Sequence, residues 1–499
     1  MAGTTILTLD VGTTACKAVL FDLDGSVAAA GEAEYPTSYP GPARAEQDPE
    51  DWWRAAVQAA RRALDSAPGV DRRTVAAVGL SSQRETVALV DTSGRPLGPA
   101  ISWMDRRGAE EIAELARQMG FENLHRRTGM VPDATFTLAK LLWLRRNDPD
   151  ALRRAAWLLQ PRDFLAARLT GEFITDPSLA SRTMLWDVQA GSWWEEGLQR
   201  AGVRASQLPR VVPSHAVVGG LTPQAAGALN LPSGIPVVAG GGDRCCEALG
   251  AGLVPGEAME STGTASNLSV VVAGLPETRD PRLAYTAHVL AGQWLVEQGL
   301  NATGALLRWL RDLAYGGPAE TGAYEQMAEE ASRVPPGADG LLVAPFFMGA
   351  RSPRWQASAR GEVGGLTLQH GRAHLARAVM EGVAFELRAC LEVLAQAGLS
   401  VSQVVAMGGG ARNRLWLQIK AAVLGLPYCT IRTELAASLG AMALAARATG
   451  LVDDPAQAVR RWNPRGERLQ PDPSLQEAYR PVIERYERWV RAVLALYRS

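Results

Sequence analysis

The acidic residue with the clearest chemical context is Asp243, which follows a short apolar segment and three consecutive glycines, Gly240 to Gly242. An aspartate at the end of such a segment has little side-chain bulk around it, so it can accept the proton of an attacking hydroxyl. The alternative role is an N-terminal cap for a helix over residues 244–250. One aspartate can do both, and we favour the catalytic role.

Two turns of similar composition lie far apart in the chain, Gly12-Thr13-Thr14 and Thr262-Gly263-Thr264. Backbone N–H groups and threonine hydroxyls in such turns can converge on an anion without a bulky side chain in the way. Asp10 precedes the first turn and could hold the water shell of Mg²⁺, which dehydrates reluctantly. Lys17 follows it and could reach a transferring phosphate. Either turn alone could be a plain hairpin, but two together can clamp a triphosphate.

A third glycine-rich segment, Gly408-Gly409-Gly410, precedes a predicted helix over residues 413–424. It could let a flat base lie against the main chain, or it could serve only close packing between a strand and a helix. The sequence has no G-x-x-x-x-G-K-[ST] motif, and no G-x-G-x-x-G between a strand and a helix. The two commonest nucleotide-binding folds are therefore not supported.

Polar residues also end a buried strand predicted at residues 75–80, in the order Gln83, Arg84, Glu85. Neighbouring arginine and glutamate are most often just a solvated pair. At the edge where a parallel sheet opens, however, they could recognise hydroxyl groups. Trp103 could form an apolar wall for the carbon face of a sugar, or could pack in the core.

The predicted elements that position these residues occur in the same order in both halves. A strand, a Gly-Thr turn and a second strand span residues 4–22 and again 258–273. Each unit is followed later by an apolar strand that ends in a polar or glycine-rich loop, at residues 75–80 and 401–407. The spacing of hundreds of residues indicates a diverged internal duplication rather than a solenoid. Mixed sheets flanked by helices, twice, predict an α/β fold with ligands at strand ends and in a cleft between the halves.

Composition narrows the class of protein. A chain of 499 residues predicts two large domains, and a net charge of -1 gives no reason to expect a nucleic-acid partner. Five scattered cysteines suggest neither a zinc site nor a disulfide framework. Without an apolar run of about 18 residues or a leader-like start, we expect no membrane partner and a cytoplasmic protein. The chain has only three lysines, Lys17, Lys140 and Lys420, against 48 arginines.

Two longer segments carry a family resemblance. Residues 361–366, read as Gly-Glu-Val-Gly-Gly-Leu, are followed after seven residues by 374–381, and together they resemble the second signature of the FGGY carbohydrate kinases. Residues 137–143 resemble the first signature, with Lys140 on the family's lysine. Thr135 departs from it, because a glycine, an aromatic or a small residue is usual there. The resemblance covers essentially the whole chain.

The resemblance implies two ribonuclease H-like domains of the sugar kinase, Hsp70 and actin superfamily, with a catalytic cleft between them. We place the N-terminal domain at residues 1–246, with the sugar site, the first phosphate motif and the catalytic aspartate, and the nucleotide-binding C-terminal domain at 247–499. The implied activity is transfer of the γ-phosphate of Mg-ATP to a hydroxyl of a small sugar or polyol, in a chain that is xylulokinase-like. The family also suggests a homodimer.

Carried over residue by residue, the resemblance assigns a site. Asp243 is the base, and Asp10 holds Mg²⁺ through water. The substrate contacts are Gln83, Arg84, Glu85, Trp103, Asp243 and Arg244. The nucleotide contacts are Gly12, Thr13, Thr14, Lys17, Thr262, Gly263, Thr264, Gly304, Gly409, Gly410 and Asn413.

The residues at the substrate positions give conflicting indications of which sugar or polyol is the substrate. Residues 101–105 and 140–143 resemble xylulokinases, yet those enzymes usually carry Met-His where Arg84-Glu85 stands and asparagine where Arg244 stands. Arg84-Glu85 and Trp103 resemble the substrate clamp of glycerol kinases, but Thr135 replaces an aromatic residue that those enzymes use. Arg244 could favour a substrate with a carboxylate or phosphate, or could point away.

We rank a ketopentose such as xylulose first, and glycerol or another polyol second. Two hypotheses of other classes stay open, an actin- or Hsp70-like ATPase that works on a protein partner and a catalytically silent sugar sensor.

Overall fold

The computed structural model describes residues 3–317 and 321–498, which form two compact units. The first comprises the residues up to Leu253, Ala273–Leu295 and Leu435–Pro464, and the second comprises Val254–Val272, Val296–Glu434 and the residues from Arg465 onward. The units interleave along the chain, whereas a boundary after residue 246 divides it once. That boundary remains a prediction.

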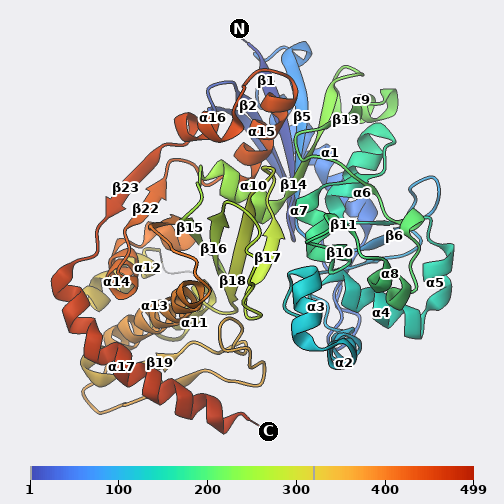
Figure 1. The fold of residues 1–499 in the computed structure, drawn as a ribbon. Coiled ribbons are helices and arrows are strands. Elements are labelled where there is room, and N and C mark those ends of the chain that lie inside the picture. The colour runs from blue at the N-terminus through green and yellow to red at the C-terminus, as the bar shows by residue number, and fades with distance from the viewer. Residues whose placement is uncertain (1–2, 318–320, 499) are drawn as a thin grey trace. The chain divides into compact units, whose positions relative to one another are not determined.

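The first unit is built on a six-stranded sheet with the order β13-β14-β5-β1-β2-β3 (Figure 1). Its strands are β1 (Thr5–Val11), β2 (Ala15–Asp22), β3 (Val27–Glu34), β5 (Val75–Ser82), β13 (Val217–Gly220) and β14 (Pro236–Gly242). Strands β1, β2 and β3 form an antiparallel meander, and β5 runs parallel to both β1 and β14. Parallel strands end at one edge of a sheet, so the segments that follow β1, β5 and β14 meet there.

Helices cover both faces of this sheet. On one face, α1 (Pro49–Asp65) and α6 (Pro161–Thr170) share an apolar core with inward residues of β1 and β5. Trp52 of α1 and Phe164 of α6 belong to this core. On the opposite face lie α10 (Asp243–Gly250) and α15 (Ala436–Ala448). Gly79 allows α15 to approach closely, because a Cβ there would stand 2.7 Å from the Ala441 carbonyl oxygen. The returning segment 435–464 thus completes the core of the first unit.

The remaining elements of the first unit are short. The helices are α2 (Ala109–Met119), α3 (Phe121–Thr128), α4 (Thr137–Asn147), α5 (Pro149–Arg154), α7 (Pro177–Ala180), α8 (Glu195–Ala201), α9 (Pro223–Leu229) and α16 (Pro455–Trp462). The strands are β4 (Glu46–Gln47), β6 (Ala88–Val90), β7 (Ala100–Ile101), β8 (Trp157–Leu159), β9 (Ile174–Thr175), β10 (Trp186–Asp187), β11 (Ser192–Trp193), β12 (Arg210–Val211) and β17 (Ala284–Ala287).

The second unit repeats the central topology of the first. Its strands follow the order β18-β16-β15-β21-β22-β23. They are β15 (Glu257–Thr262), β16 (Ser266–Val272), β18 (Trp294–Leu300), β21 (Gln403–Met407), β22 (Tyr428–Ile431) and β23 (Arg465–Leu469). β15 pairs antiparallel with β16 and parallel with β21, just as β1 pairs antiparallel with β2 and parallel with β5. β21 in turn pairs parallel with β22, just as β5 pairs parallel with β14. The predicted recurrence of a strand–turn–strand unit is confirmed.

The second unit also contains the small β19 (Leu342–Ala344) and β20 (Glu362–Gly364) pair and five helices, α11 (Gly304–Ala314), α12 (Ala323–Ser332), α13 (Arg372–Gln396), α14 (Arg414–Leu424) and α17 (Pro473–Leu496). The second FGGY-like segment runs into α13, where Glu381 is buried. Its carboxylate accepts hydrogen bonds from Arg377 (2.7 Å), from the Tyr479 hydroxyl (2.9 Å) and from the Gly337 N–H (3.0 Å). This part of the segment is therefore a structural anchor for the helices.

Within residues 3–317 and 321–498, no helix has an apolar stretch long enough to cross a membrane.

A substitution at Gly240 tests whether close packing of β14 against β5 is needed to position Asp243. Its φ is +65° and a Cβ there would lie 1.7 Å from the Leu80 carbonyl oxygen, so Gly240→Ala combines a left-handed strain with a clash against β5. We expect a loss of about 2 kcal/mol or more in the free energy of unfolding, measured by thermal or urea denaturation. The matched control is Gly227→Ala within α9, where a Cβ meets nothing within 4 Å. Equal melting temperatures for the two variants would contradict this account.

Candidate functional site

The end of β1 carries a partly buried carboxylate, that of Asp10. Asp10 pairs in register with Ser81 of β5 and Lys17 of β2. Its Oδ1 is buried and has no hydrogen-bond partner among the described residues. Burial, and then repulsion from Asp243, raises the pKa of Asp10 to about 6. A buried carboxylate oxygen without a donor suits a hydrated hard cation such as Mg²⁺, so Asp10 fits the predicted metal role.

The first turn, Gly12-Thr13-Thr14, is held from behind by protein side chains. The Gly12 N–H donates to the Ala15 carbonyl (2.9 Å) and closes the turn. Gln47 Nε2 donates to the Thr13 carbonyl (2.8 Å), and the Tyr35 hydroxyl donates to the Gly12 carbonyl. Because these carbonyl oxygens are already hydrogen-bonded to the protein, a ligand would contact the opposite side of the turn. Thr14 and the nearby Lys17 are both exposed.

Gln83 and Trp103 support this turn. The Gln83 side chain is 1% exposed, and its amide donates to Gln47 (2.9 Å) and accepts from Thr86 (3.2 Å). Trp103 Nε1 donates to the Thr13 hydroxyl (3.0 Å). The Gln83 amide is committed to its neighbours, which favours a supporting role over direct contact with a substrate. Trp103 is only partly buried, so its ring retains a face for a ligand.

Arg84 and Glu85 do not pair with each other. Arg84 Nε lies 3.2 Å from Asp243 Oδ1, with side-chain exposures of 7% and 35%. The partly withdrawn position raises the pKa of Asp243, while Arg84 and Arg244 act to lower it. Asp243 is also the first residue of α10, and its Oδ1 accepts from the Arg244 N–H (2.7 Å). The aspartate thus combines a position at a strand end with a contact to the start of the helix.

Sequence reasoning missed Arg182, the partner of Glu85. Arg182 Nε donates to Glu85 Oε1 (2.5 Å), and the guanidinium carbon lies 4.9 Å from the centre of the Phe136 ring. Glu85 itself has a φ of +64°, an unusual conformation for a non-glycine residue that is often found at functional sites. Arg182 belongs to no motif. The available signal was a glutamate at the end of a buried strand, which requires a cation nearby.

Arg244 turns toward its own helix. Its Nη1 donates to Glu247 Oε2 at 2.7 Å, one turn further along α10. The arginine beside the candidate base is therefore engaged by a carboxylate of the protein.

Lys140 of α4, on the first FGGY-like segment, is also removed from solvent. It is 0% exposed, and its Nζ donates to the Thr135 carbonyl (2.5 Å). Burial lowers the pKa of Lys140 to about 7. This hydrogen bond fixes the loop that precedes α4, so the lysine of the first FGGY-like segment has a structural role here.

The second unit brings the other predicted residues together. A Cβ on Gly304, at the start of α11, would lie 2.1 Å from the Gly263 carbonyl oxygen, and one on Gly410 would lie 2.6 Å from Thr262 Cβ. The turn Thr262-Gly263-Thr264, the start of α11 and the Gly408–Gly410 segment are therefore in close contact. Gly263, Thr264 and Gly409 are exposed, whereas Thr262 is buried with its hydroxyl turned inward. Asn413 caps α14 by accepting from the Trp416 N–H (3.0 Å).

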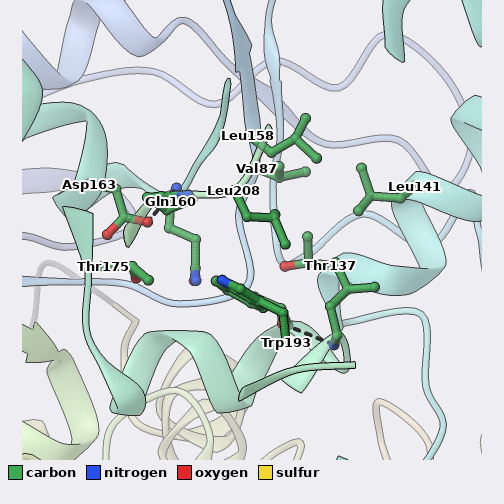
Figure 2. Close-up of a pocket in the computed structure, with 12 residues that line it drawn as sticks. Val87, Thr137, Leu141, Leu158, Gln160, Asp163, Thr175, Trp193 and Leu208 are labelled. Atoms are coloured by element: carbon green, nitrogen blue, oxygen red, sulfur yellow. Dashed lines mark hydrogen bonds between the residues drawn. The ribbon is translucent and has the colours of Figure 1, made fainter. Parts of the chain in front are cut away.

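None of the predicted site residues lines the cavity that Figure 2 shows in the first unit. It is lined by Val87, Thr137, Leu141, Leu158, Gln160, Asp163, Thr175, Thr183, Leu185, Trp193, Leu208 and Pro209. Its volume of about 20 Å³ suffices for a single water molecule and excludes a sugar. This cavity is therefore not the substrate site.

The raised pKa of Asp10 predicts a pH-dependent effect on stability. The folded protein binds the proton of Asp10 up to about pH 6, whereas the unfolded chain releases it near pH 3.8. The ionised carboxylate therefore destabilises the folded state at neutral pH, and this cost disappears as the pH falls from 6 to below 4. With EDTA present, we expect Asp10→Asn to melt at a higher temperature than the wild type at pH 7–8 and at a similar temperature at pH 4.

Thermal melts across this pH range test the prediction. Asp453→Asn, at an exposed loop position, controls for the loss of one negative charge. A wild type that is more stable than Asp10→Asn at pH 7 without metal would contradict it.

Comparison with known proteins agrees with this geometry. The N-terminal domain of the FGGY family of carbohydrate kinases matches residues 5–250, and the C-terminal domain matches residues 260–449. A xylulose kinase from Escherichia coli (strain K12) is 32% identical over 494 residues, which cover 98% of this chain and 99% of that protein. A glycerol kinase from Thermus brockianus is 36% identical over 511 residues, covering 97% and 99%.

The same fold has been solved in related proteins. The structure of a xylulose kinase from Rhodospirillum rubrum superposes with a TM-score of 0.91 at 31% identity, and covers 99% of each chain. The predicted resemblance and the predicted two-domain α/β fold are both confirmed. The chain belongs to the FGGY family of carbohydrate kinases, sugar phosphotransferases that act on small sugars or polyols with ATP and a divalent metal.

Proposed function

We propose that this kinase transfers the γ-phosphate of Mg-ATP to a hydroxyl of a ketopentose such as xylulose, with Asp243 as the general base. Glycerol or another polyol is the second candidate. The observation that carries the proposal is the position of Asp243, which the end of β14 presents beside Arg84 at 3.2 Å.

In the proposed step, Asp243 orients the acceptor hydroxyl and takes its proton as the oxygen attacks phosphorus. Partial burial raises the pKa of Asp243 above its ordinary value, which makes it a stronger base. The guanidinium of Arg84 acts in the opposite direction and favours the ionised carboxylate. The Thr14 and Lys17 region and the exposed turn residues Gly263 and Thr264 would hold the phosphates.

Asp10 is the residue that would hold Mg²⁺, through coordinated water. When bound, the metal would neutralise charge on the phosphoryl oxygens. The chain's contribution is a buried oxygen with no competing hydrogen-bond donor among the described residues.

The charges at the site support an uncharged acceptor. Arg84 is paired with Asp243, Arg182 with Glu85, and Arg244 with Glu247. A substrate carboxylate or phosphate would have to compete with these contacts, and the Arg182–Glu85 pair is largely withdrawn from water. Sugar hydroxyls can instead share the exposed lone pairs and N–H groups of such pairs. This geometry disfavours the idea that Arg244 selects an anionic substrate.

The environment of Thr135 supports a ketopentose over glycerol. Its hydroxyl donates to Asp133 (2.5 Å) and accepts from Arg106 (3.2 Å). The short side chain is thus tied to its own loop, at a position where the glycerol kinases resembled here use an aromatic residue on the substrate. A small residue at this place leaves room for a larger acceptor.

Asp243→Asn tests the base. We expect kcat to fall by roughly a hundredfold or more, the usual scale for a lost acid–base group, while the affinity for a non-hydrolysable ATP analogue changes little. Steady-state kinetics and calorimetric titration measure the two quantities. Near-normal turnover in this variant would remove Asp243 from the role.

An ADP-release assay tests the substrate, with D-xylulose, L-xylulose, D-ribulose, L-ribulose, glycerol, erythritol and gluconate as acceptors. We expect the highest kcat/KM with a ketopentose and little turnover with gluconate, because the arginines are already paired. A preference for glycerol would support the second candidate. Turnover independent of any acceptor would favour the ATPase hypothesis, and no turnover would favour the silent sensor.

A further inference from the structure

A buried ion pair lies directly beneath the second turn. Lys420 Nζ of α14 is 2.7 Å from Glu260 Oε2 and 3.0 Å from Oε1, both on the side chain of one β15 residue. The two side chains are 0% and 1% exposed. Lys420 is one of three lysines in the chain, and neither the predicted site nor the proposed mechanism uses it.

Hydroxyl groups join this pair to the turn. The Thr262 hydroxyl donates to Glu260 Oε1 and accepts from Lys420 Nζ (3.2 Å). The Ser266 hydroxyl contacts both Glu260 Oε1 (3.0 Å) and Thr303 Oγ1 (3.0 Å). Thr262 and Ser266 face each other across the turn, as the register pair that closes it. The network therefore holds both ends of the turn.

The same network reaches the start of α11. Thr303 is the residue before Gly304, and its N–H donates to the Thr264 carbonyl (3.1 Å). An ammonium group can only donate hydrogen bonds and an ionised carboxylate can only accept them, so the pair fixes the direction of the Thr262 hydroxyl between them. The charges consequently determine how Thr262, Ser266 and Thr303 are oriented.

Folding alone does not require charges at this place. Counted back from the Gly-Thr sequence of each turn, Glu260 of β15 corresponds to Leu9 of β1. Leu9 is fully buried in an apolar core, in a strand with the same topology. Because a buried ion pair is often no more stabilising than apolar residues of similar size, its presence here calls for another role. The compact ammonium of lysine also fits over the Trp416 ring at 4.0 Å.

We propose that Lys420 and Glu260 are positioning residues for nucleotide phosphates. They hold the turn Thr262-Gly263-Thr264 and the start of α11 in one arrangement, so that Gly263 and Thr264 meet the β- and γ-phosphates without reorganising. The inference rests on the nucleotide role proposed above for this turn. It adds a dependence of phosphate affinity on two buried side chains that do not touch the ligand.

The test uses the full-length variant Lys420→Met/Glu260→Met, which removes both charges together and leaves no unpaired charge in the core. Calorimetry measures the affinities for AMP-PNP, a non-hydrolysable ATP analogue, and for AMP, which lacks the β- and γ-phosphates. We expect AMP-PNP to bind about tenfold more weakly than to the wild type, and AMP to change less than twofold. Lys420→Met alone should show the same pattern if it folds.

Arg377→Met/Glu381→Met is the matched control, because it removes another buried ion pair of the second unit, in which Arg377 Nε is 2.7 Å from Glu381 Oε1. It should shift the melting temperature without changing the ratio of AMP-PNP to AMP affinity. An unchanged AMP-PNP affinity in the Lys420/Glu260 variant, or equal weakening of AMP-PNP and AMP, would overturn the positioning role. A wild type that binds no AMP-PNP would instead overturn the proposed function on which it rests.

Discussion

The contact between Arg84 and Asp243 is the interaction on which the first unit's site depends. It requires β5 and β14 to be parallel neighbours, since Ser82 and Gly242 are register partners and the two charged residues follow them. It also requires a glycine at position 242, because a Cβ there would stand 2.6 Å from Arg84 Cδ. The three glycines before Asp243 therefore do more than expose the base. They let Arg84 lie against the strand, where its guanidinium favours the ionised form of the Asp243 carboxylate.

Charge is treated differently in the two units, although their central topology is the same. In the first, Asp10 is partly buried and its Oδ1 has no hydrogen-bond partner in the described part of the chain, an arrangement that costs stability and is suited to a cation. In the second, Glu260 is neutralised by Lys420 and serves to orient hydroxyl groups. In the proposed mechanism, a common strand–turn–strand unit thus supports two kinds of contact with a phosphate group, one through a metal-binding carboxylate and one through a backbone turn that a buried ion pair holds in place.

Much of this could be predicted from the sequence. The apolar strands, the Gly-Thr turns and the helix predicted at residues 413–424 are set by local patterns, and the structure has them within a residue or two of those places. The residues around Asp10, Asp243 and the two turns were predicted because their types suggest phosphate chemistry. Arg182, Lys420 and Glu260 were not, because each matters only through a partner about a hundred residues or more away. No local pattern indicates that Arg182 meets Glu85 or that Lys420 meets Glu260.

The same limit explains the interleaved units. Residues 435–464 follow the glycine-rich segment of the second unit, yet α15 completes the core of the first. The close approach at Gly79, and a similar one where a Cβ on Gly440 would lie 2.0 Å from the Cys246 carbonyl oxygen, are among the contacts that show this return. A glycine in a strand or helix pattern indicates a close neighbour without indicating which one.

The central claim is that a sugar hydroxyl, rather than water, receives the phosphoryl group. Running the reaction with Mg-ATP and D-xylulose in H₂¹⁸O and analysing the products by ³¹P NMR and mass spectrometry tests it most directly. Transfer to the sugar predicts a sugar phosphate without ¹⁸O in its phosphoryl group and little inorganic phosphate. Inorganic phosphate that carries ¹⁸O as the main product, at a rate unaffected by the sugar, would contradict the account.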